Sequence, residues 1–559
     1  MTSRSASRSP PFRRARADER VLPGVTCQSF GPGGQVYRDA SYDSARLARL
    51  QRFPLRTRIA FRALGTAALL FLLPWVVYGS AISLPYGLRD DYAIQREAHE
   101  EPGKILRVCG AMGRPLYGWL LERATRETDG VEGLSALRAL GVLGLALLSL
   151  VLHLLFRAEG WRRAHAALLA AFLTVIPSAQ VVASWSICWP QAVALLASAL
   201  AFALARQGLG PSTSGARRWL WCVGAVVALA ASTLIYQASG PFYAVLLAAA
   251  LVTRRFDDVR TPARWLASHL FVVGGGLGLA YAITRLTFWL GLFTPSPRMA
   301  LERHFVDKAA WFVTQVLPNA LALNALNDTD AAPSGGYWPM VGVTLAVLTL
   351  GLVVEGRRAG RVGVGTWGMA LVGLSGVAYC ASLLASERWP TYRTLYALTG
   401  VWSVFFFAAV VKLGELWPAR GPRMAVAVLG GFVAVSALLA HLQSVELFAR
   451  PQGRELELMR QGAAAIIPAR KPRVFVLTAR QGDSSASQRY LDEFGSVSVD
   501  TEWVAKELLA TVVRERFPLE RNPQSLYRFA AGAVLPEARA YDILVDMRQT
   551  RRVPLQFAR

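Results

Sequence analysis

The 559-residue chain is short of charge, and above all of negative charge. Only 18% of its residues are charged, against roughly 25% in ordinary globular domains. Asp and Glu together number 37, whereas Lys and Arg number 61. Because 53% of the residues are also hydrophobic, the composition excludes a soluble protein of this size and indicates a chain that crosses a membrane repeatedly.

Cysteine is scarce as well. The five cysteines are scattered without CxxC spacing, and none follows Cys380, so neither a disulfide framework nor a thiolate metal site is expected. The net charge of +24 lies in terminal and loop arginines and forms no aromatic-interleaved groove or nucleic-acid motif. No internal repeat is evident, which counts against the inverted-repeat transporter folds.

What the chain does contain is a series of apolar runs near the roughly 20 residues that a membrane helix needs. The runs at 190–206 and 240–253 are short and are expected to tilt, break or extend. We therefore expect an α-helical polytopic membrane protein with about eleven spans, at 61–82, 134–156, 165–185, 190–206, 219–237, 240–253, 266–290, 338–355, 364–385, 394–413 and 424–444.

The loop arginines predict which way these spans run. Five arginine-rich loops all fall on the same side of the membrane as residues 1–57, and the positive-inside bias makes that side the cytoplasm; the loops are 157–163, 205–218, 254–260, 355–361 and 412–423. Residues 1–57 are rich in Ser, Arg and Pro and are expected to be a disordered basic cytoplasmic tail. An odd number of spans then places the C-terminus outside the cytoplasm.

Hydropathy falls after residue 444, which divides a membrane domain at 58–444 from a terminal domain at 445–559. Segments 474–478 and 542–547 have the composition of strands, and 501–516 has the pattern of a helix. This region is predicted to be a small extracytoplasmic α/β domain with its own core.

The loop at 83–133, just outside the first span, concentrates ionisable groups: Arg89, Asp90, Asp91, Arg96, Glu97, His99, Glu100, Glu101 and Arg114. Charges beside a bilayer are costly unless they are solvated, paired or functional, so this loop is the candidate catalytic segment. A helix is expected from about Tyr92 to Arg107, interrupted at Pro102-Gly103.

The adjacent carboxylates Asp90 and Asp91 are the candidate catalytic groups. On a helix, neighbouring side chains point about 100° apart, so we expect one to face a pocket and the other to orient it or to cap the helix. A carboxylate at the edge of a bilayer can have a raised pKa and act as a general base. The alternative is that the pair only solvates a loop and caps the following helix.

Three short motifs carry a resemblance to a known family. LRDDY at 88–92, GRPLYGWL at 113–120 and DEFGSVS at 492–498 resemble segments of the O-antigen-modifying glucosyltransferases of bacterial inner membranes. The acidic pair after the first span, the many spans and the outside terminal domain resemble the wider GT-C class of membrane glycosyltransferases. The resemblance is loose over the membrane region and strongest in the first loop.

The resemblance implies a glycosyltransferase that moves a sugar, such as glucose, from a polyprenyl-phosphate donor to an extracytoplasmic glycan or lipid-linked glycan. Asp90 or Asp91 would supply the general base, and arginines would bind the lipid phosphate. No resident cofactor follows from it; a divalent metal at the leaving phosphate stays possible. The implied location is the bacterial cytoplasmic membrane.

Arginines at the outside edge are the phosphate candidates. Arg114 either binds phosphate or pairs with Glu97 or Glu100, and Arg388 and Arg393 either bind phosphate or anchor lipid headgroups. Arg285, inside an apolar run, needs a partner or must snorkel to the interface. The aromatic ring of Tyr392 could stack on a sugar. The expected substrate-binding residues are Arg114, Arg388, Tyr392, Arg393, Arg285, Arg96, Glu97 and Tyr92.

A transporter or flippase for lipid-linked glycans is the alternative from another functional class. It predicts charged residues lining the middle of the spans, and most of the apolar runs lack them. A membrane assembly partner without catalysis is a third interpretation, in which the first loop is only structural.

Overall fold

The computed structural model describes residues 63–210, 213–254, 260–327, 335–479, 489–520 and 522–552. Residues Ala63–Arg559 form one compact unit. The tail expected at 1–57 lies outside the described residues.

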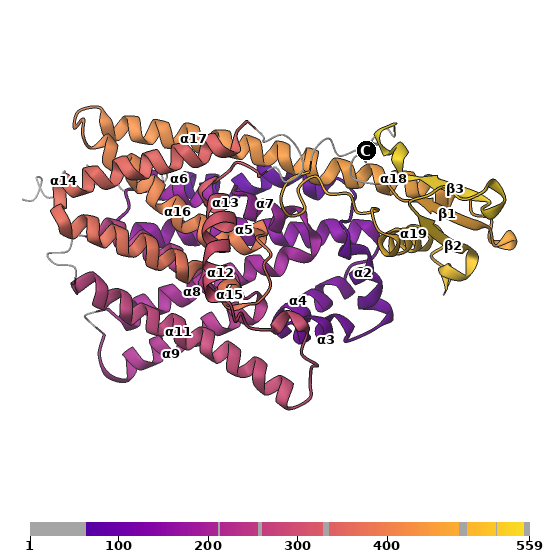
Figure 1. Cartoon of the computed structure of the whole chain (residues 1–559), viewed down its shortest axis with the longest axis horizontal. Coiled ribbons are helices and arrows are strands. Elements are labelled where there is room, and N and C mark those ends of the chain that lie inside the picture. The colour runs from indigo at the N-terminus through magenta and orange to yellow at the C-terminus, as the bar shows by residue number, and fades with distance from the viewer. Residues whose placement is uncertain are drawn as a thin grey trace, which may run out of the picture. The chain divides into compact units, whose positions relative to one another are not determined.

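Within the described residues, eight helices are long and apolar enough to cross a membrane. They confirm a helical polytopic membrane protein (Figure 1). The eight are Ala63–Ser83, α5 (Gly130–Ala158), η1 with α8 (Ser186–Cys188 and Trp189–Gly208), α9 (Gly215–Ile235), α11 (Arg260–Trp289), α14 (Tyr337–Ala378), α16 (Tyr392–Gly414) and α17 continuing through η5 into α18 (Gly421–Gln443, Ser444–Ala449 and Arg450–Ala464).

The remaining predicted runs are also helical, but broken or short. The run at 165–185 is α6 (Arg163–Leu173) followed by α7 (Pro177–Ser184), with a bend of 56° between them. The run at 240–253 is η2 (Gly240–Phe242) followed by the buried α10 (Tyr243–Thr253). Of the two runs that the sequence marked as short, 240–253 is a short helix, whereas 190–206 extends to the span Ser186–Gly208. The break within 165–185 was not predicted.

Helix α14 folds back on itself and supplies two of the predicted runs. Gly360 lies at φ 60 and ψ −150, a conformation open to glycine. A Cβ on Gly351 would lie 3.7 Å from Cζ3 of Trp367, although these residues would be about 24 Å apart along a straight helix. The two limbs are therefore antiparallel neighbours (Figure 1).

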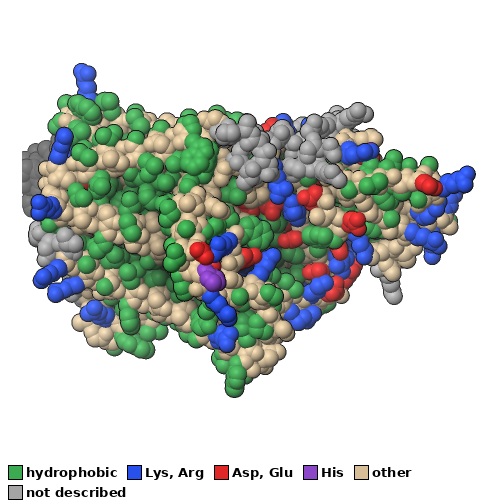
Figure 2. All heavy atoms as spheres, viewed as in Figure 1, with side chains coloured by type: hydrophobic (Ala, Val, Ile, Leu, Met, Phe, Trp, Pro, Cys, Tyr) green, Lys and Arg blue, Asp and Glu red, His purple; other side chains and the backbone are tan. Residues whose placement is uncertain are grey.

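Apolar side chains cover a broad zone of the helical region, and charged side chains gather beyond it (Figure 2). The charged zone next to the terminal domain contains α2 (Asp90–Glu100), α3 (Lys104–Ala111) and α4 (Pro115–Arg126). The interruption expected at Pro102-Gly103 is confirmed, because α2 ends at Glu100 and Gly103 has φ 83. We call this end of the helical region the α2 end.

Short helices connect the spans at the α2 end. They are η3 (Pro297–Met299), α12 (Phe305–Trp311), the π-helix η4 (Phe312–Val316), α13 (Leu317–Leu321) and α15 (Cys380–Leu384).

The terminal domain contains a parallel sheet of order β2-β1-β3. Strand β1 (Arg473–Leu477) pairs Val474 with Phe529 of β2 (Arg528–Gly532) and with Ile543 of β3 (Ile543–Asp546). Helices α18 and α19 (Glu502–Arg516) contact the sheet. The predicted strands and helix are confirmed as β1, β3 and α19, whereas the sequence missed β2. The described part of the domain also contains the 3-10 turns η6 (Pro468–Arg470), η8 (Pro523–Leu526), η9 (Ala538–Ala540) and η10 (Met547–Arg552).

The membrane helices and the terminal domain are joined by helix rather than by a loop. The path from α17 through η5 to α18 crosses residue 444, where hydropathy falls, without leaving a helical conformation. The first loop also contacts the terminal domain, because Arg96 Nε donates to Glu507 on α19 over 2.7 Å.

A fully buried arginine in α5 fixes the approach to the first loop. Arg138 donates to the carbonyls of Ala81 (2.5 Å), Tyr86 (2.7 Å) and Leu84 (3.0 Å). Its guanidinium also donates to the hydroxyls of Ser135 (2.8 Å) and Ser186 (3.0 Å) and lies 3.9 Å from the centre of the Tyr86 ring. These carbonyls lie in the last turn of the first span and just after it, where the helical ladder ends, so a buried donor must satisfy them.

Replacing Arg138 should therefore destabilise the whole α2 end. Arg138→Met leaves three buried carbonyls without this donor, at a cost of about 1–3 kcal/mol for each unsatisfied group. We expect a clearly lower thermal unfolding midpoint in detergent, followed by tryptophan fluorescence. The control is the exposed Arg123 of α4, which pairs with Glu127. Arg123→Met should change stability by no more than about 0.5 kcal/mol. Equal midpoints for both variants would contradict this role.

Candidate active site

A cavity of about 910 Å³ opens at the α2 end, between the start of α2, the ends of α9 and α11, and residues 489–493. We call it the central cavity. Segments from the first loop, the membrane helices and the terminal domain all contribute to its wall. Its charged and aromatic lining residues are Arg89, Asp90, Arg114, Trp185, Tyr236, Tyr281, Arg298, Glu387, Trp389, Arg393, Arg489, Tyr490, Asp492, Glu493 and Trp503.

Asp90, the first residue of α2, lines the central cavity. Its carboxylate forms no hydrogen bond or ion pair with the described part of the chain. Burial raises its pKa and nearby Glu493 raises it further, while Arg393, Arg89 and Arg298 lower it. A carboxylate that faces a cavity with free lone pairs and a raised pKa is suited to accept a proton.

Asp91 points the other way and does not line the cavity. It is fully buried and accepts from the backbone N–H of Leu88 (2.8 Å) and of Ile187 (3.2 Å). Burial raises its pKa to about 7, although these N–H groups and Arg138 act in the opposite direction. Asp91 thus ties the start of α2 to η1, and the two carboxylates diverge as helix geometry requires.

Arg89 holds the start of α2 in an unusual backbone conformation, with φ 43. Its N–H donates to Ser498 Oγ (2.9 Å), and its guanidinium pairs with Glu493 (3.0 Å) and Asp500 (3.2 Å). Positive φ at a non-glycine residue costs on the order of 1–3 kcal/mol and persists only where surrounding contacts enforce it. The contacts here come from the terminal domain, which therefore fixes how Asp90 enters the cavity.

The segment 489–500 brings the terminal domain into the cavity wall. Asp492 pairs with Arg393 at 3.1 Å, and Phe494 packs edge-on against Tyr392 and Phe448. Burial raises the pKa of Asp492, and Arg393 lowers it. The sequence marked DEFGSVS at 492–498 only as a resemblance and assigned it no site residue. The feature of the sequence that could have identified it is the acidic pair Asp492-Glu493 beside an otherwise uncharged stretch.

Arg114 also lines the cavity and has no ion pair with a described residue. Its Nε donates to Gln237 Oε1 (2.5 Å), and its guanidinium lies 4.7 Å from the centre of the Tyr236 ring. The alternative pairing with Glu97 or Glu100 is wrong, because these glutamates pair with Lys104 and with Arg96 and Arg514 respectively. The guanidinium edge of Arg114 is available for an anion.

Three of the other cavity arginines are already paired, whereas Arg489 forms no ion pair with a described residue. Arg393 lies over Trp185 at 4.5 Å in addition to its pair with Asp492. Arg298 is 3.6 Å from Glu387 and lies over Trp389 at 5.5 Å. Two buried donors in this wall, Trp185 Nε1 and Arg393 Nε, have no partner among the described residues. Such orphaned N–H groups are suited to hydroxyl or phosphate oxygens.

Five of the predicted substrate-binding residues line neither this cavity nor the one described next. Tyr92 is buried and its hydroxyl donates to Gly87, and the Tyr392 hydroxyl accepts from the N–H of Asn327. The other three form ion pairs: Arg96 with Glu507, Glu97 with Lys104, and Arg388 with Glu302. The structure thus places these five in packing and ion pairs around the site.

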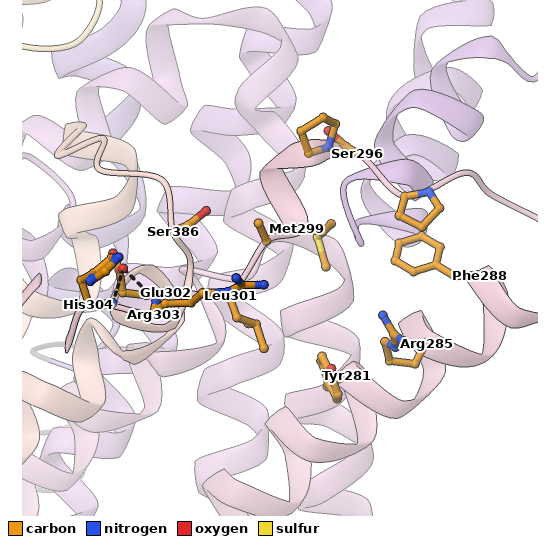
Figure 3. A pocket seen from close by; sticks show the side chains of 13 residues that line it. Tyr281, Arg285, Phe288, Ser296, Met299, Leu301, Glu302, Arg303, His304 and Ser386 are labelled. Atoms are coloured by element: carbon orange, nitrogen blue, oxygen red, sulfur yellow. Dashed lines mark hydrogen bonds between the residues drawn. The ribbon is translucent and has the colours of Figure 1, made fainter.

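The remaining predicted residue, Arg285, lines a second cavity of about 810 Å³, which we call the outer pocket (Figure 3). Tyr281, Met299, Ala300 and Leu301 line both cavities, so the outer pocket adjoins the central one.

Sequence reasoning assigned no site role to Arg298 or Glu493. Each lies within a few residues of a segment that the sequence did single out, but what brings them together is the packing of segments distant in the chain. The described ranges contain no cluster of three or more His, Cys, Asp or Glu residues that could hold a metal ion.

Several solved membrane enzymes are similar to this chain in structure. An Archaeoglobus fulgidus oligosaccharyltransferase with a tethered acceptor peptide aligns at TM-score 0.43 and 15% identity, over 84% of this chain and 64% of its own. The same organism's AglB with an inhibitory peptide and a dolichol-phosphate aligns at 0.41 and 13%, over 85% and 64%. ArnT from Cupriavidus metallidurans aligns at 0.39 and 15%, over 75% and 83%.

The chain therefore spans about 64% of the length of the oligosaccharyltransferase structures. No family model matches the chain, and no curated protein matches it. At these TM-scores the similarity does not define the activity.

The two aspartates should differ in stability when replaced. Asp91→Asn turns one acceptor oxygen into a donor facing a backbone N–H, which costs about 1–3 kcal/mol. Asp90→Asn removes no contact within the described residues and should stay within about 0.5 kcal/mol of the parent. Thermal unfolding of the purified variants measures both. A stable Asp91→Asn beside a destabilised Asp90→Asn would reverse the assignment.

Proposed function

We propose that this protein is a membrane glycosyltransferase that moves a sugar from a polyprenyl-phosphate donor to a glycan or lipid-linked glycan outside the cytoplasm. The observation that carries the proposal is the central cavity itself. It places Asp90, a carboxylate with no described partner, in one chamber with Arg114, a guanidinium with no described counterion.

Asp90 serves as the general base. The acceptor hydroxyl oxygen forms a bond to the anomeric carbon while its proton passes to Asp90. The bond from that carbon to the phosphate oxygen breaks, and the lipid phosphate leaves with the electron pair. A pKa raised by burial and by Glu493 brings the carboxylate closer to neutral pH, where general-base catalysis is efficient.

Arg114 receives the lipid phosphate. Of the five arginines that line the cavity, Arg114 and Arg489 form no ion pair with a described residue, and Arg114 belongs to the resembling GRPLYGWL segment. Its planar fork suits a phosphate, and Gln237 and Tyr236 hold it in place. The leaving phosphate gains charge in the transition state, so a preorganised guanidinium stabilises that state.

The sugar lies between these groups. Trp185, Tyr236 and Trp389 line the central cavity and present aromatic faces of the kind that stack on sugar rings. The resemblance of LRDDY, GRPLYGWL and DEFGSVS makes a hexose such as glucose the proposed cargo. The arginine-rich loops support an orientation with the α2 end outside the cytoplasm, and the same resemblance supports the bacterial inner membrane.

Asp90→Asn should remove sugar transfer while preserving the fold. The expected loss is about 10²- to 10⁴-fold, the usual contribution of a positioned base. Transfer by the parent should rise with pH through the folded pKa of Asp90, which lies above the ordinary value of about 4, because the base acts only when deprotonated. The measurement is label transfer from a polyprenyl-phosphate sugar in reconstituted vesicles at several pH values.

The matched control is Glu132→Gln, an exposed carboxylate on α5 with no described partner. It should retain the parent rate and pH profile. Full activity in both Asp90→Asn and Asp91→Asn, and in the double variant, would remove the enzyme interpretation.

Arg114→Ala should weaken use of the donor more than Arg114→Lys, because lysine keeps the charge but loses the planar fork. The loss in kcat/KM for the donor should be at least about tenfold for alanine, since hydrogen bonds to charged groups contribute about 1.5–3 kcal/mol. Arg123→Ala on α4 is the control. Donor kinetics equal to the parent in both Arg114 variants would show that Arg114 only supports the fold.

A further inference from the structure

The outer pocket lies beside the central cavity but has its own set of charges. It is bordered by α11, by residues 295–304 and by Ser386. In Figure 3, Arg285 reaches it from α11, and Arg303 comes from the opposite wall. Residues 299–301 line both spaces, so this short segment is the partition between them.

The outer pocket has an excess of positive charge. Neither Arg285 nor Arg303 forms an ion pair within the described ranges. The carboxylate that lines the pocket, Glu302, is largely used: it accepts from the N–H groups of Arg303 and His304 at 2.8 Å each and lies 3.7 Å from Arg388. Two exposed guanidinium groups therefore face a space in which the opposing charge is already engaged, as an anion site requires.

The chain segments that border this pocket carry exposed apolar side chains, of which Leu301 lines the pocket itself. Trp289 is 80% exposed, Leu286 51%, Leu301 57% and Phe305 62%. Trp289 is the last residue of the apolar helix α11, which is one of the candidate spans. Arginines beside exposed tryptophan and leucine at the end of a span form the pattern of a membrane interface, where guanidinium groups meet lipid phosphates. A soluble anion would need no such apolar surroundings.

We propose that the outer pocket binds the phosphate of a second membrane lipid, the one that carries the acceptor. The central cavity has its own unpaired arginine, Arg114, for the donor phosphate. Two cationic sites on either side of residues 299–301 hold two anionic lipids at once, with their headgroups next to each other. This inference rests on the proposed function, which requires an acceptor. It adds that the acceptor is a glycan carried on an anionic lipid.

The test is a comparison of two lipids across two variants. Full-length protein purified in neutral detergent is incubated separately with phosphatidylglycerol, polyprenyl phosphate and inorganic phosphate, and retained ligand is measured by native mass spectrometry. Arg285→Ala/Arg303→Ala should lower phosphatidylglycerol retention about tenfold and leave polyprenyl phosphate unchanged. Arg114→Ala should do the reverse.

The control is Arg420→Ala/Arg423→Ala, which removes two exposed arginines at the start of α17 and should change neither lipid. Arg285→Lys/Arg303→Lys should keep part of the phosphatidylglycerol binding, since the charge remains. All four arginines are exposed, so the variants are expected to fold, and matching unfolding midpoints establish this.

Three results would overturn the inference. They are unchanged phosphatidylglycerol retention in Arg285→Ala/Arg303→Ala, loss of polyprenyl phosphate in that variant, and inorganic phosphate bound there as well as the lipid. Transfer activity separates this inference from the proposed function. Active protein with unchanged phosphatidylglycerol retention refutes only the second lipid site. If Arg285→Ala/Arg303→Ala loses only phosphatidylglycerol and the parent protein never transfers sugar, only the proposed enzyme activity is refuted.

Discussion

The buried Arg138 and the buried Asp91 beneath the start of α2 are the constraint on which the α2 end depends. Arg138 donates to carbonyls at the end of the first span and just after it, and Asp91 accepts from two backbone N–H groups, one of them in η1. Each group satisfies what the other cannot: a guanidinium only donates and a carboxylate only accepts. Such groups are tolerated in a membrane protein because their partners are fixed.

From this anchor the chain reaches the cavity in two steps. Asp91 fixes the first turn of α2, and the neighbouring Asp90 must then point elsewhere, into the central cavity. The terminal domain sets the final angle, because Arg89 is held at positive φ by contacts to Ser498, Glu493 and Asp500. The terminal domain is thus a wall of the site, and it also supplies Glu493, which raises the pKa of Asp90.

At the α2 end, arginines at the edge of the apolar region are mostly paired with carboxylates. Arg96 pairs with Glu507, and Arg393 pairs with Asp492. Arg114 in the central cavity, and Arg285 with Arg303 in the outer pocket, form no ion pair with a described residue. An unpaired guanidinium at a lipid boundary is costly unless it meets solvent or an anion, which is why these three positions carry the two proposals.

The sequence alone determined the elements. Eleven apolar runs, the break at Pro102-Gly103 and the strands at 474–478 and 542–547 follow from hydropathy, proline and β-branched residues, which are local properties. It also ranked Asp90 and Asp91 as candidates but could not distinguish them. Only the tertiary structure did so, because the partners of Asp91 and the segment at 489–500 are distant in the chain, and local pattern carries no information about which distant groups meet. The same reason hid β2, whose five residues have little strand signal until β1 pairs with them.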